Sequence, residues 1–593
     1  MRRLGVRPGD DSSSSVFRLP NHVANNLSPE ESANVIADHF SSISLDYDPI
    51  DVNSFSPKLK DAYNAPDISK VPVLTDYDVY HKIKRAKKPN SSVTSDLPRK
   101  LVKEFSRELA YPISVIFNSI LRSLEYPRQW VVEHQTPIPK VYPPQSENDL
   151  RNIAKTSFFS KVFESYLSDL LLPYVQPYLD PMQFGLKGGS INHYLIKLLR
   201  FIHTNLDLKD PHAVVLALVD LSKAFNRISH LLVIEDLHDM HVPAWLLRIL
   251  TSYLTERSMV LTYDGAKSSP RSLPGSSPQG AFLGIFLFII KFNGVSLRPP
   301  IYRQCCSLKH DSSTHMIYID DLSEAASFRL KNLSLASKSR PHPLPYHERT
   351  GHCLPAANVL QENLNKVEEF TKKNLMKINH SKSNTMLFNI SKTLDFPPEF
   401  TFSDGEILKC VEESKLLGVV ISSNLKWHSN TSHIVKKAMS RMWLLRRMKH
   451  LKLDNHFIFD YYIKEIRPVA EFGAVVWHSG ITTGQKSDIE RIQKVAFKII
   501  LSDSYTSYTR ACADFNVQSL EERRIQLCTK FAIKLYNSDR RRQFFEPAIF
   551  SDKTRSKKPL VKEEVSRTKR CFSAPHNFLA RIINSNQDKI KVK

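Results

Sequence analysis

An apolar run at residues 214–219 ends in an aspartate, Asp220. The run is too short for a typical helix and no polar residue interrupts it, so it predicts a strand that is buried on both faces. A second apolar run, residues 316–319, ends in the pair Asp320 and Asp321. An ionised carboxylate is costly among apolar neighbours unless something pairs it. The chain must therefore fold so that both strands deliver their carboxylates to a place where the charge is compensated.

Divalent cations are the simplest compensation for such a group of carboxylates. Two strands that bring Asp220 and Asp320 to one place would repel each other unless cations lie between them. Mg²⁺ prefers oxygen ligands, and it is commonly held by one or two carboxylates together with substrate phosphates. Two such ions, about 4 Å apart, can clamp the attacking and leaving oxygens of a phosphoryl displacement. An Asp-Asp pair alone is often only turn chemistry, so the prediction depends on its combination with Asp220.

The charge balance indicates a polyanionic partner. The 593 residues contain 83 Lys and Arg against 60 Asp and Glu, a formal net charge of +23. Such a basic balance favours nucleic acid, although a solvated basic surface or a membrane-surface binder would also show it. Seven cysteines without a C-x-x-C pair predict neither a disulfide framework nor a zinc finger, and they suggest a reducing compartment.

No targeting or membrane segment is readable. The N-terminus lacks the apolar core of a signal peptide, and the longest apolar run, residues 281–290, is too short to span a bilayer. We therefore expect an intracellular protein, in nucleus and cytoplasm, without a membrane partner.

The hydrophobic periodicity alternates between helices and strands and then becomes helical. Residues 1–30 are polar and predict a loose lead-in, and residues 334–355 hold four prolines and predict an inserted loop. From about residue 430 the pattern is mainly helical, with a basic face that is either solvated or a contact for a nucleic-acid backbone. Further helices are expected at 155–175, 241–256 and 358–378, and a strand at 258–265.

Seven motifs in order resemble one family. The segments "VVLALVDLSKAF", "SSPQGAFLGIFLF", "YIDDLSEA", "NLMKINHSKSNTMLF" and "KLLGVVISSNLKW" resemble motifs A to E of the reverse transcriptases of non-LTR retrotransposons, the jockey-like LINE group. Upstream, "TPIPK…DLRNIAKTSFFSKVFES" and "QFGLKGGSINHYLI" resemble its fingers motifs. The resemblance, which covers roughly residues 70–585, also includes a thumb and connecting region and the C-terminal end.

The resemblance implies an α+β fold, the right-hand polymerase fold, with fingers, a palm built on an antiparallel sheet, and a mainly helical thumb. The expected organisation is a partly disordered N-terminal extension (1–70), fingers and an N-terminal helical region (71–210), the palm with motifs A to E (211–425), and the thumb with a basic C-terminal region (426–593).

The resemblance also implies a catalytic metal site. Asp220 and Asp320 would bind both catalytic ions, Asp321 would support them, and the backbone carbonyl of Leu221 would be a further ligand. The ions would be Mg²⁺, with Mn²⁺ as an alternative.

The substrate contacts are likewise implied by the resemblance. Phe225 matches the aromatic gate that leaves no room for a 2′-hydroxyl, although a core phenylalanine would fit this position equally well. The other matching positions are Gln279 and Gly280 under the template base and incoming nucleotide, Lys140 and Arg151 on the triphosphate, and Lys382 as a donor of a proton to pyrophosphate. Alternatively, Gln279 and Gly280 form an ordinary turn, and the basic residues are surface charges.

Several positions depart from the usual motifs without removing a carboxylate. Asn226 stands where the family usually has Asp, and Ile319 stands where it usually has Ala. Ser276 occupies the first glycine position of motif B, and Asn152 follows Arg151 where proline is usual.

The sequence therefore predicts an RNA-directed DNA polymerase that extends a primer on an RNA template. Its expected partners are an RNA template, a DNA primer or target, and deoxynucleoside triphosphates. An inactive nucleic-acid-binding remnant is the main alternative; an RNA-dependent RNA polymerase is disfavoured by Phe225 and the thumb resemblance. No endonuclease ahead of residue 70 and no C-terminal zinc knuckle are readable, so we expect a polymerase-only fragment, or one that relies on another protein for the nick.

Overall fold

The computed structural model describes residues 17–86, 97–186, 188–210, 212–278, 282–295, 312–329, 355–390, 398–548 and 559–590. The chain forms two compact units that exchange segments. The first unit consists of Met1–Pro181, Leu221–Ser296 and Glu369–Ile378, and the second of Met182–Asp220, Leu297–Glu368 and Asn379–Lys593. These boundaries differ from the predicted limits of fingers, palm and thumb, so that functional subdivision stays a prediction.

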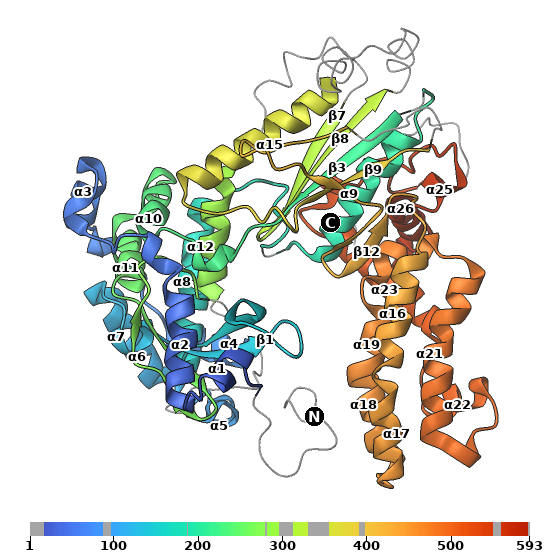
Figure 1. Cartoon of the computed structure of the whole chain (residues 1–593), viewed down its shortest axis with the longest axis horizontal. Helices are drawn as coiled ribbons and strands as arrows, with labels where there is room; N and C mark the ends of the chain where they lie inside the picture. The colour runs from blue at the N-terminus through green and yellow to red at the C-terminus, as the bar shows by residue number, and fades with distance from the viewer. Residues whose placement is uncertain are drawn as a thin grey trace. The chain divides into compact units, whose positions relative to one another are not determined.

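A five-stranded sheet forms the centre of the second unit, in the order β10-β9-β3-β8-β7 (Figure 1). The predicted buried strand is β3 (His212–Val219), and all eight of its residues are buried. It pairs antiparallel with β8 (Asp321–Arg329) and with β9 (Asn384–Phe388). The edges are β7 (Ser312–Tyr318), antiparallel to β8, and β10 (Lys409–Cys410), parallel to β9. The apolar runs of the sequence are thus confirmed as strands of one sheet.

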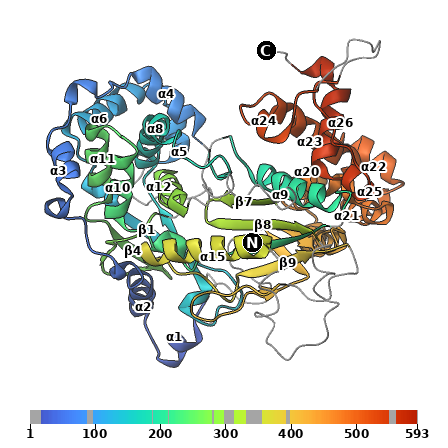
Figure 2. The same ribbon diagram turned by 90° about the horizontal axis from the view of Figure 1, so that it is seen from above.

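Helix α9 (Ile191–Leu206) packs on β3 and β7 and covers one face of this sheet (Figure 2). Its residues Leu195, Leu199 and Ile202 are fully buried in one apolar cluster with Val214 and Leu216 of β3. Burying leucine-sized side chains contributes about 1.5–3 kcal/mol each relative to exposure. The helix and the sheet are therefore joined mainly by apolar contact.

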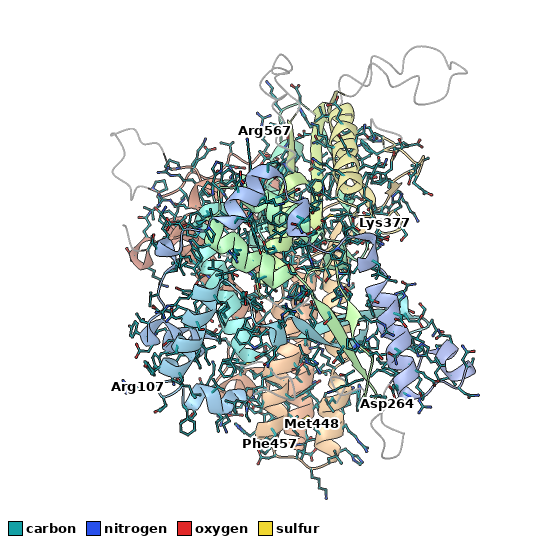
Figure 3. All side chains as sticks on the ribbon, turned by 90° about the vertical axis from the view of Figure 1, so that its left-hand side faces the viewer. Arg107, Asp264, Lys377, Met448, Phe457 and Arg567 are labelled. Atoms are coloured by element: carbon teal, nitrogen blue, oxygen red, sulfur yellow. The ribbon has the colours of Figure 1, made fainter. Side chains whose placement is uncertain are left out.

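The rest of the second unit is mainly helical, as the periodicity predicts. After the hairpin β11 (Glu413–Leu416) and β12 (Val419–Ser422) come α16 (His428–Met439), α17 (Met442–His450), α18 (Asn455–Tyr461), α21 (Thr483–Leu501) and α23 (Leu520–Tyr536). The predicted apolar stripe is buried at Ile434, Ala438, Met442 and Leu445, whereas the basic residues Lys436, Lys437, Arg446 and Arg447 are exposed. Met448 and Phe457 lie near the turn that joins α17 to α18 (Figure 3).

The first unit contains a mixed sheet with the order β2-β1-β4-β5. Strand β1 (Val132–Pro139) runs antiparallel to β2 (Leu150–Lys155) and parallel to β4 (Ser258–Tyr263). The short β5 (Ala266–Lys267) and β6 (Arg271–Ser272) both pair with β4. The predicted helices of this unit are confirmed as α8 (Phe158–Val175) and α11 (Ala244–Leu254), and the apolar segment after residue 281 forms α12 (Phe282–Phe292).

The N-terminal segment corrects one expectation. Residues 17–30 are not a loose lead-in: α1 (Pro20–Ala24) and the start of α2 (Pro29–Ser41) lie within them. Helix α2 packs on β4, and its residues Ala33, Ile36 and Ala37 are fully buried. Residues 1–16 lie outside the described residues, as does the predicted inserted loop up to residue 354.

The expected helix at 358–378 is α15 (Pro355–Lys373). Within the part of the chain that the structure describes, no helix is long and apolar enough to cross a bilayer.

Candidate active site

The register of the central sheet brings the predicted carboxylates together. Val219 of β3 is paired with Leu322 of β8, so Asp220 and Asp321, the next residue outward on each strand, lie at the same end of the sheet. Asp321 also pairs with Tyr318 of β7, and Ile319 and Asp320 form the two-residue turn between β7 and β8. Asp220 thus shares one end of the sheet with Asp320 and Asp321, which lie about one hundred residues later in the sequence.

The three carboxylates interact electrostatically. Burial, together with the negative charges of Asp320 and Asp220, raises the pKa of Asp321 to about 7. Asp220 forms an ion pair with Lys382, whose Nζ lies 3.7 Å from Asp220 Oδ2. The Lys382 side chain is 68% exposed, so solvent screens this ion pair and it compensates little of the charge. The site retains excess negative charge.

The backbone of Asp220 is fixed by the segment that carries Lys382. The Asp220 N–H donates to Ser383 Oγ (3.1 Å), and its carbonyl accepts from the N–H of Asn379 (2.8 Å). These contacts place the motif D segment beside the end of β3. Only Lys382 is predicted from the string "NHSKSN", although Asn379 and Ser383, which bond the Asp220 backbone, belong to the same string.

The turn that carries Asp320 has an unusual conformation. Ile319 has a φ of +61°, in the left-handed region that β-branched residues rarely adopt. Its N–H donates to Gln183 Oε1 (3.0 Å), which also accepts from the Gly185 N–H (2.8 Å). The segment around Gln183 forms a short parallel bridge to Ile317 of β7. Gln183, whose side chain is 2% exposed, therefore holds the turn in its strained form.

Gly185 is required at this turn for a steric reason. A Cβ at residue 185 would lie 2.6 Å from Ile319 Cγ1 and 2.9 Å from the Ile319 nitrogen. The motif "QFGLKGG" resembles the family, but its pattern alone predicts no role for Gln183 and Gly185.

Phe225 lies in the first unit, in the short 3₁₀ turn Ala224–Asn226. Its ring stacks on Phe288 of α12 with a centroid distance of 4.7 Å, and the side chain is only partly buried. The Phe225 carbonyl accepts from the Ser277 N–H (2.7 Å). One side of the ring therefore has a packing role, and the remaining exposure is compatible with a gate.

The neighbouring motif B is described only in part. Ser276 adopts no positive φ, and its N–H donates to His230 Nε2 (3.1 Å), so serine is accommodated at the usual glycine position. Gln279 and Gly280 lie outside the described residues. Leu221 begins the segment of the first unit and forms a bridge to Ile378.

Lys140 and Arg151 lie on one hairpin of the first unit. Arg151 of β2 is paired with Ile138 of β1, and the Lys140 N–H continues the ladder to the Asp149 carbonyl (2.7 Å). Side chains alternate along a strand, so residues 138, 140 and 151 share one face of the hairpin. Both basic side chains are exposed, and Lys140 Nζ also donates to the Asn148 carbonyl (2.9 Å).

The opposite face of this hairpin contains a buried polar chain. Asn152 donates to Gln135 Oε1 (2.5 Å), Gln135 donates to Glu133 Oε2 (2.8 Å), and Glu133 pairs with Arg257 (3.0 Å). Asn152 thus makes a contact that the usual proline could not make. These buried hydrogen bonds and the ion pair hold the hairpin in place from the face opposite to Lys140 and Arg151.

The carboxylates fit divalent cations without forming a closed cage. Among the described residues, no three His, Cys, Asp or Glu side chains converge as a ready metal-binding cluster. Mg²⁺ commonly takes only one or two carboxylates and completes its shell with water and phosphate oxygens. An open set whose mutual repulsion raises the pKa of Asp321 suits that requirement.

Part of the chain matches a family of known proteins. Residues 138–421 match the family "Reverse transcriptase (RNA-dependent DNA polymerase)". This segment is a reverse transcriptase domain. The family implies a polymerase palm fold, and the reverse transcriptase domain of this chain has the corresponding mixed α/β composition.

Curated relatives are polymerases of mobile elements. The chain is 25% identical over 435 residues to the probable RNA-directed DNA polymerase from transposon BS of Drosophila melanogaster, covering 71% of this chain and 44% of that protein. It is 24% identical to the X-element protein of the same species (67% and 40%) and 24% identical to the RNA-directed DNA polymerase from mobile element jockey of Drosophila funebris (64% and 38%). The chain spans less than half the length of these relatives. The resemblance to non-LTR retrotransposons of the jockey group is confirmed.

Gln183 gives a test of how the reverse transcriptase domain holds its Asp320 turn. Gln183→Met keeps the side-chain length but removes the acceptor oxygen. The backbone N–H groups of Ile319 and Gly185 then lose their hydrogen bonds to this side chain. We expect a loss of about 1–3 kcal/mol in unfolding free energy and a lower rate of primer extension, measured by denaturation and by extension assay. Gln183→Glu, which keeps an acceptor oxygen, should recover most of the stability; equal effects of both changes would contradict the assigned role.

The raised pKa of Asp321 predicts how metal-free stability depends on pH. The folded chain binds a proton at Asp321 more tightly than the unfolded chain, whose value is near 3.8. This contribution is fully present below about pH 4 and is lost as pH rises through about 7, by up to about 4 kcal/mol. Asp321→Asn cannot ionise, so in EDTA it should melt at a higher temperature than wild type at about pH 8. A melting temperature that is lower than wild type at that pH would contradict the assignment.

Proposed function

We propose that this chain is an RNA-directed DNA polymerase of a non-LTR retrotransposon, which extends a primer on an RNA template by two-metal nucleotidyl transfer. The observation that carries the proposal is that Asp220, Asp320 and Asp321 lie at the same end of the central sheet, with the pKa of Asp321 raised to about 7. The substrates are deoxynucleoside triphosphates, an RNA template and a DNA primer or target.

The residues have separate roles in this proposal. Asp220 and Asp320 hold Mg²⁺ or Mn²⁺, and Asp321 and the Leu221 carbonyl complete the site. When bound, the ions neutralise phosphate charge and activate the primer hydroxyl. Lys382, whose ammonium is 3.7 Å from Asp220, holds the proton that pyrophosphate takes as it leaves.

The nucleotide is selected and gripped by residues of the first unit. Phe225 excludes a 2′-hydroxyl, and Lys140 and Arg151 bind the triphosphate from the exposed face of their hairpin. Gln279 and Gly280 support the template base and the incoming nucleotide. The helices after residue 426 serve as the thumb, the segment 71–210 contributes the fingers, and the protein acts in nucleus and cytoplasm.

Primer extension tests the proposed function directly. The purified chain is incubated with poly(rA)/oligo(dT) and dTTP, with Mg²⁺ or Mn²⁺ and with EDTA as the control. Extension that requires the metal supports the proposal. A folded wild type that fails with both metals on several RNA templates would instead identify an inactive nucleic-acid-binding remnant.

Binding of an RNA–DNA hybrid should depend strongly on salt. The net charge of +23 and the exposed basic residues of α16 and α17 indicate contacts to phosphates rather than to bases. Each phosphate contact to a duplex contributes about 0.9 to the slope of log K against log salt. We expect a linear fall that corresponds to several contacts, measured by fluorescence anisotropy; an affinity that does not change with salt would contradict this.

A further inference from the structure

A second candidate site lies at the end of the central sheet that is opposite to the carboxylates. It is a cavity of about 570 Å³ within the second unit. Its walls come from α9, from the loop after β12, from α21, and from α25 (Lys569–Phe572) and the start of α26 (Pro575–Ser585). The α9 residue is His203, near the helix end that leads into the start of β3, whereas Asp220 follows the end of β3. Eight strand residues separate these ends by about 25 Å.

The lining of the cavity is cationic. It includes Lys426, Lys569 and Arg570 together with His203 and His428, and no Asp or Glu is among the described residues that form it. Burial, together with the neighbouring His576 and Arg570, lowers the pKa of His203 to about 3, so this ring is neutral at pH 7. Burial also lowers the pKa of Arg570, whereas the nearby carboxylate of Asp207 acts in the opposite direction on both groups. Asp207 is not part of the lining, and the positive potential of the cavity comes from Lys426, Lys569 and Arg570.

Two buried polar atoms in this lining have no hydrogen-bond partner among the described residues. They are Nδ1 of His203, a residue that is 6% exposed, and Nε2 of Gln485, which is 3% exposed. Gln485 Oε1 accepts from the Thr482 N–H (2.7 Å), so its remaining polar atom is the amide donor. Buried polar atoms are nearly always bonded in native proteins. Both atoms lie below the accessible surface, so they show that this wall is polar but are not contacts for a ligand in the cavity.

The N-terminus of α26 lines the same cavity with Ala574 and Pro575. Neither residue offers a free backbone donor, because the Ala574 N–H donates to the Cys571 carbonyl (3.1 Å) and proline has no N–H. This helix end therefore contributes only its partial positive charge, which favours an anion.

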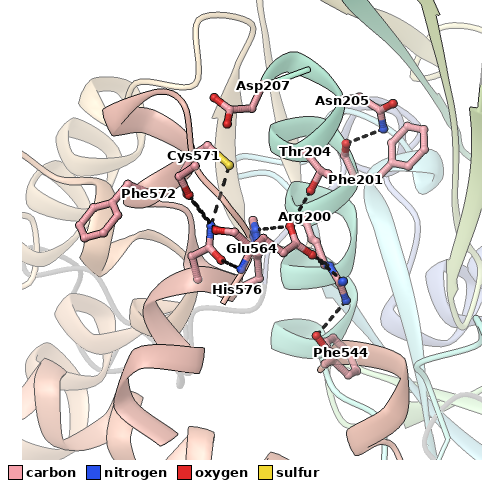
Figure 4. A network of polar contacts seen from close by, with 12 residues as sticks. Arg200, Phe201, Thr204, Asn205, Asp207, Phe544, Glu564, Cys571, Phe572 and His576 are labelled. Atoms are coloured by element: carbon pink, nitrogen blue, oxygen red, sulfur yellow. Dashed lines mark hydrogen bonds and ion pairs between the residues drawn. The ribbon is translucent and has the colours of Figure 1, made fainter. Parts of the chain in front are cut away.

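The C-terminal wall of the cavity is held on α9 by a network of charged contacts (Figure 4). Glu564 accepts from Arg200 Nε (2.6 Å) and from Thr204 Oγ1 (3.0 Å). Asp207 accepts from the backbone N–H of Arg567 (2.6 Å) and from the N–H and Oγ1 of Thr568 (3.0 and 2.6 Å). These contacts fix the segment that carries Lys569 and Arg570, so the cavity exists before any ligand binds.

We propose that this cavity binds a phosphate group of a single nucleic-acid strand, as a contact separate from the polymerisation site. Lys426, Lys569 and Arg570 attract the strand and bind the phosphate oxygens, and the partial positive charge at the N-terminus of α26 adds to the attraction. The choice of nucleic acid as the polymer rests on the proposed function; the phosphate chemistry rests on the cavity. A volume of this size accommodates one nucleotide.

The test measures binding of a 5′-phosphorylated tetrathymidylate to the full chain in EDTA, by calorimetry. Lys569→Ala combined with Arg570→Ala should weaken this binding about tenfold and reduce the salt slope by about 1.4, the value for two single-strand phosphate contacts. Lys530→Ala combined with Lys534→Ala removes the same charge from exposed positions of α23 outside the cavity and should leave both unchanged. Lys426 also lines the cavity and is exposed, so Lys426→Ala is not expected to disturb the fold. This variant should also weaken binding, and it keeps the test valid if the double variant fails to fold.

Three outcomes would overturn the proposal. They are equal affinity of wild type and of the folded cavity variants, an equal loss in the α23 control, and binding of inorganic phosphate or of thymidine monophosphate as tight as that of the tetranucleotide. The last result would assign the cavity to a free anion. Primer extension is measured separately, so failure of the polymerase proposal and failure of this one remain distinguishable.

Discussion

Replacing Asp220 or Asp320 with asparagine is expected to lower primer extension by about three or more powers of ten while the protein stays folded. Each substitution keeps the shape of the side chain and removes one charge from a site that must hold divalent cations against a triphosphate. Circular dichroism and melting temperature check the fold, and extension of oligo(dT) on poly(rA) measures activity.

A matched control separates loss of the site from loss of a negative charge. Asp503→Asn makes the same change at an exposed position among the helices of the second unit and should extend primers as wild type does. Affinity for the RNA–DNA hybrid should survive in all three variants, because lysine and arginine residues elsewhere carry it. If Asp220→Asn or Asp320→Asn retains extension comparable with an active wild type, the metal-site assignment is wrong.

Phe225→Val is expected to admit ribonucleotides while deoxynucleotide use stays largely intact. The smaller side chain leaves room for a 2′-hydroxyl, and we expect the preference for dTTP over UTP to fall about a hundredfold. The measurement is kcat/KM for each nucleotide on the same primer and template. Loss of the stacking contact with Phe288 should also cost about 1–3 kcal/mol of stability.

Phe225 also packs against α12, so the test needs a control variant that loses apolar packing at a position away from the nucleotide. Phe117→Leu alters a fully buried ring of α6 (Ala110–Ser123) in the same unit and should lower stability without changing the preference for dTTP. An unchanged preference in Phe225→Val, or an equal change in Phe117→Leu, would show that Phe225 is only part of the core.

Local pattern was sufficient to find the strands and their carboxylates. The run 214–219 is apolar at every position, and only a strand buried on both faces accommodates that pattern in so few residues. The same reasoning found the hairpin that carries Asp320 and the apolar stripe of α16 and α17. These features depend on the order of side chains along one element, which is what periodicity reports.

Sequence pattern thus predicts which carboxylates end which strands, and the composition predicts a polyanionic partner. Only the tertiary structure decided how Asp320 is held. The left-handed Ile319 depends on Gln183, which is more than one hundred residues away in sequence and reaches it through pairing along the edge of β7. The cationic cavity likewise joins residues from α9, the loop after β12, α21 and the C-terminal segment. Such contacts between distant segments have no periodicity in the sequence, because they arise from packing that places unrelated stretches of chain side by side.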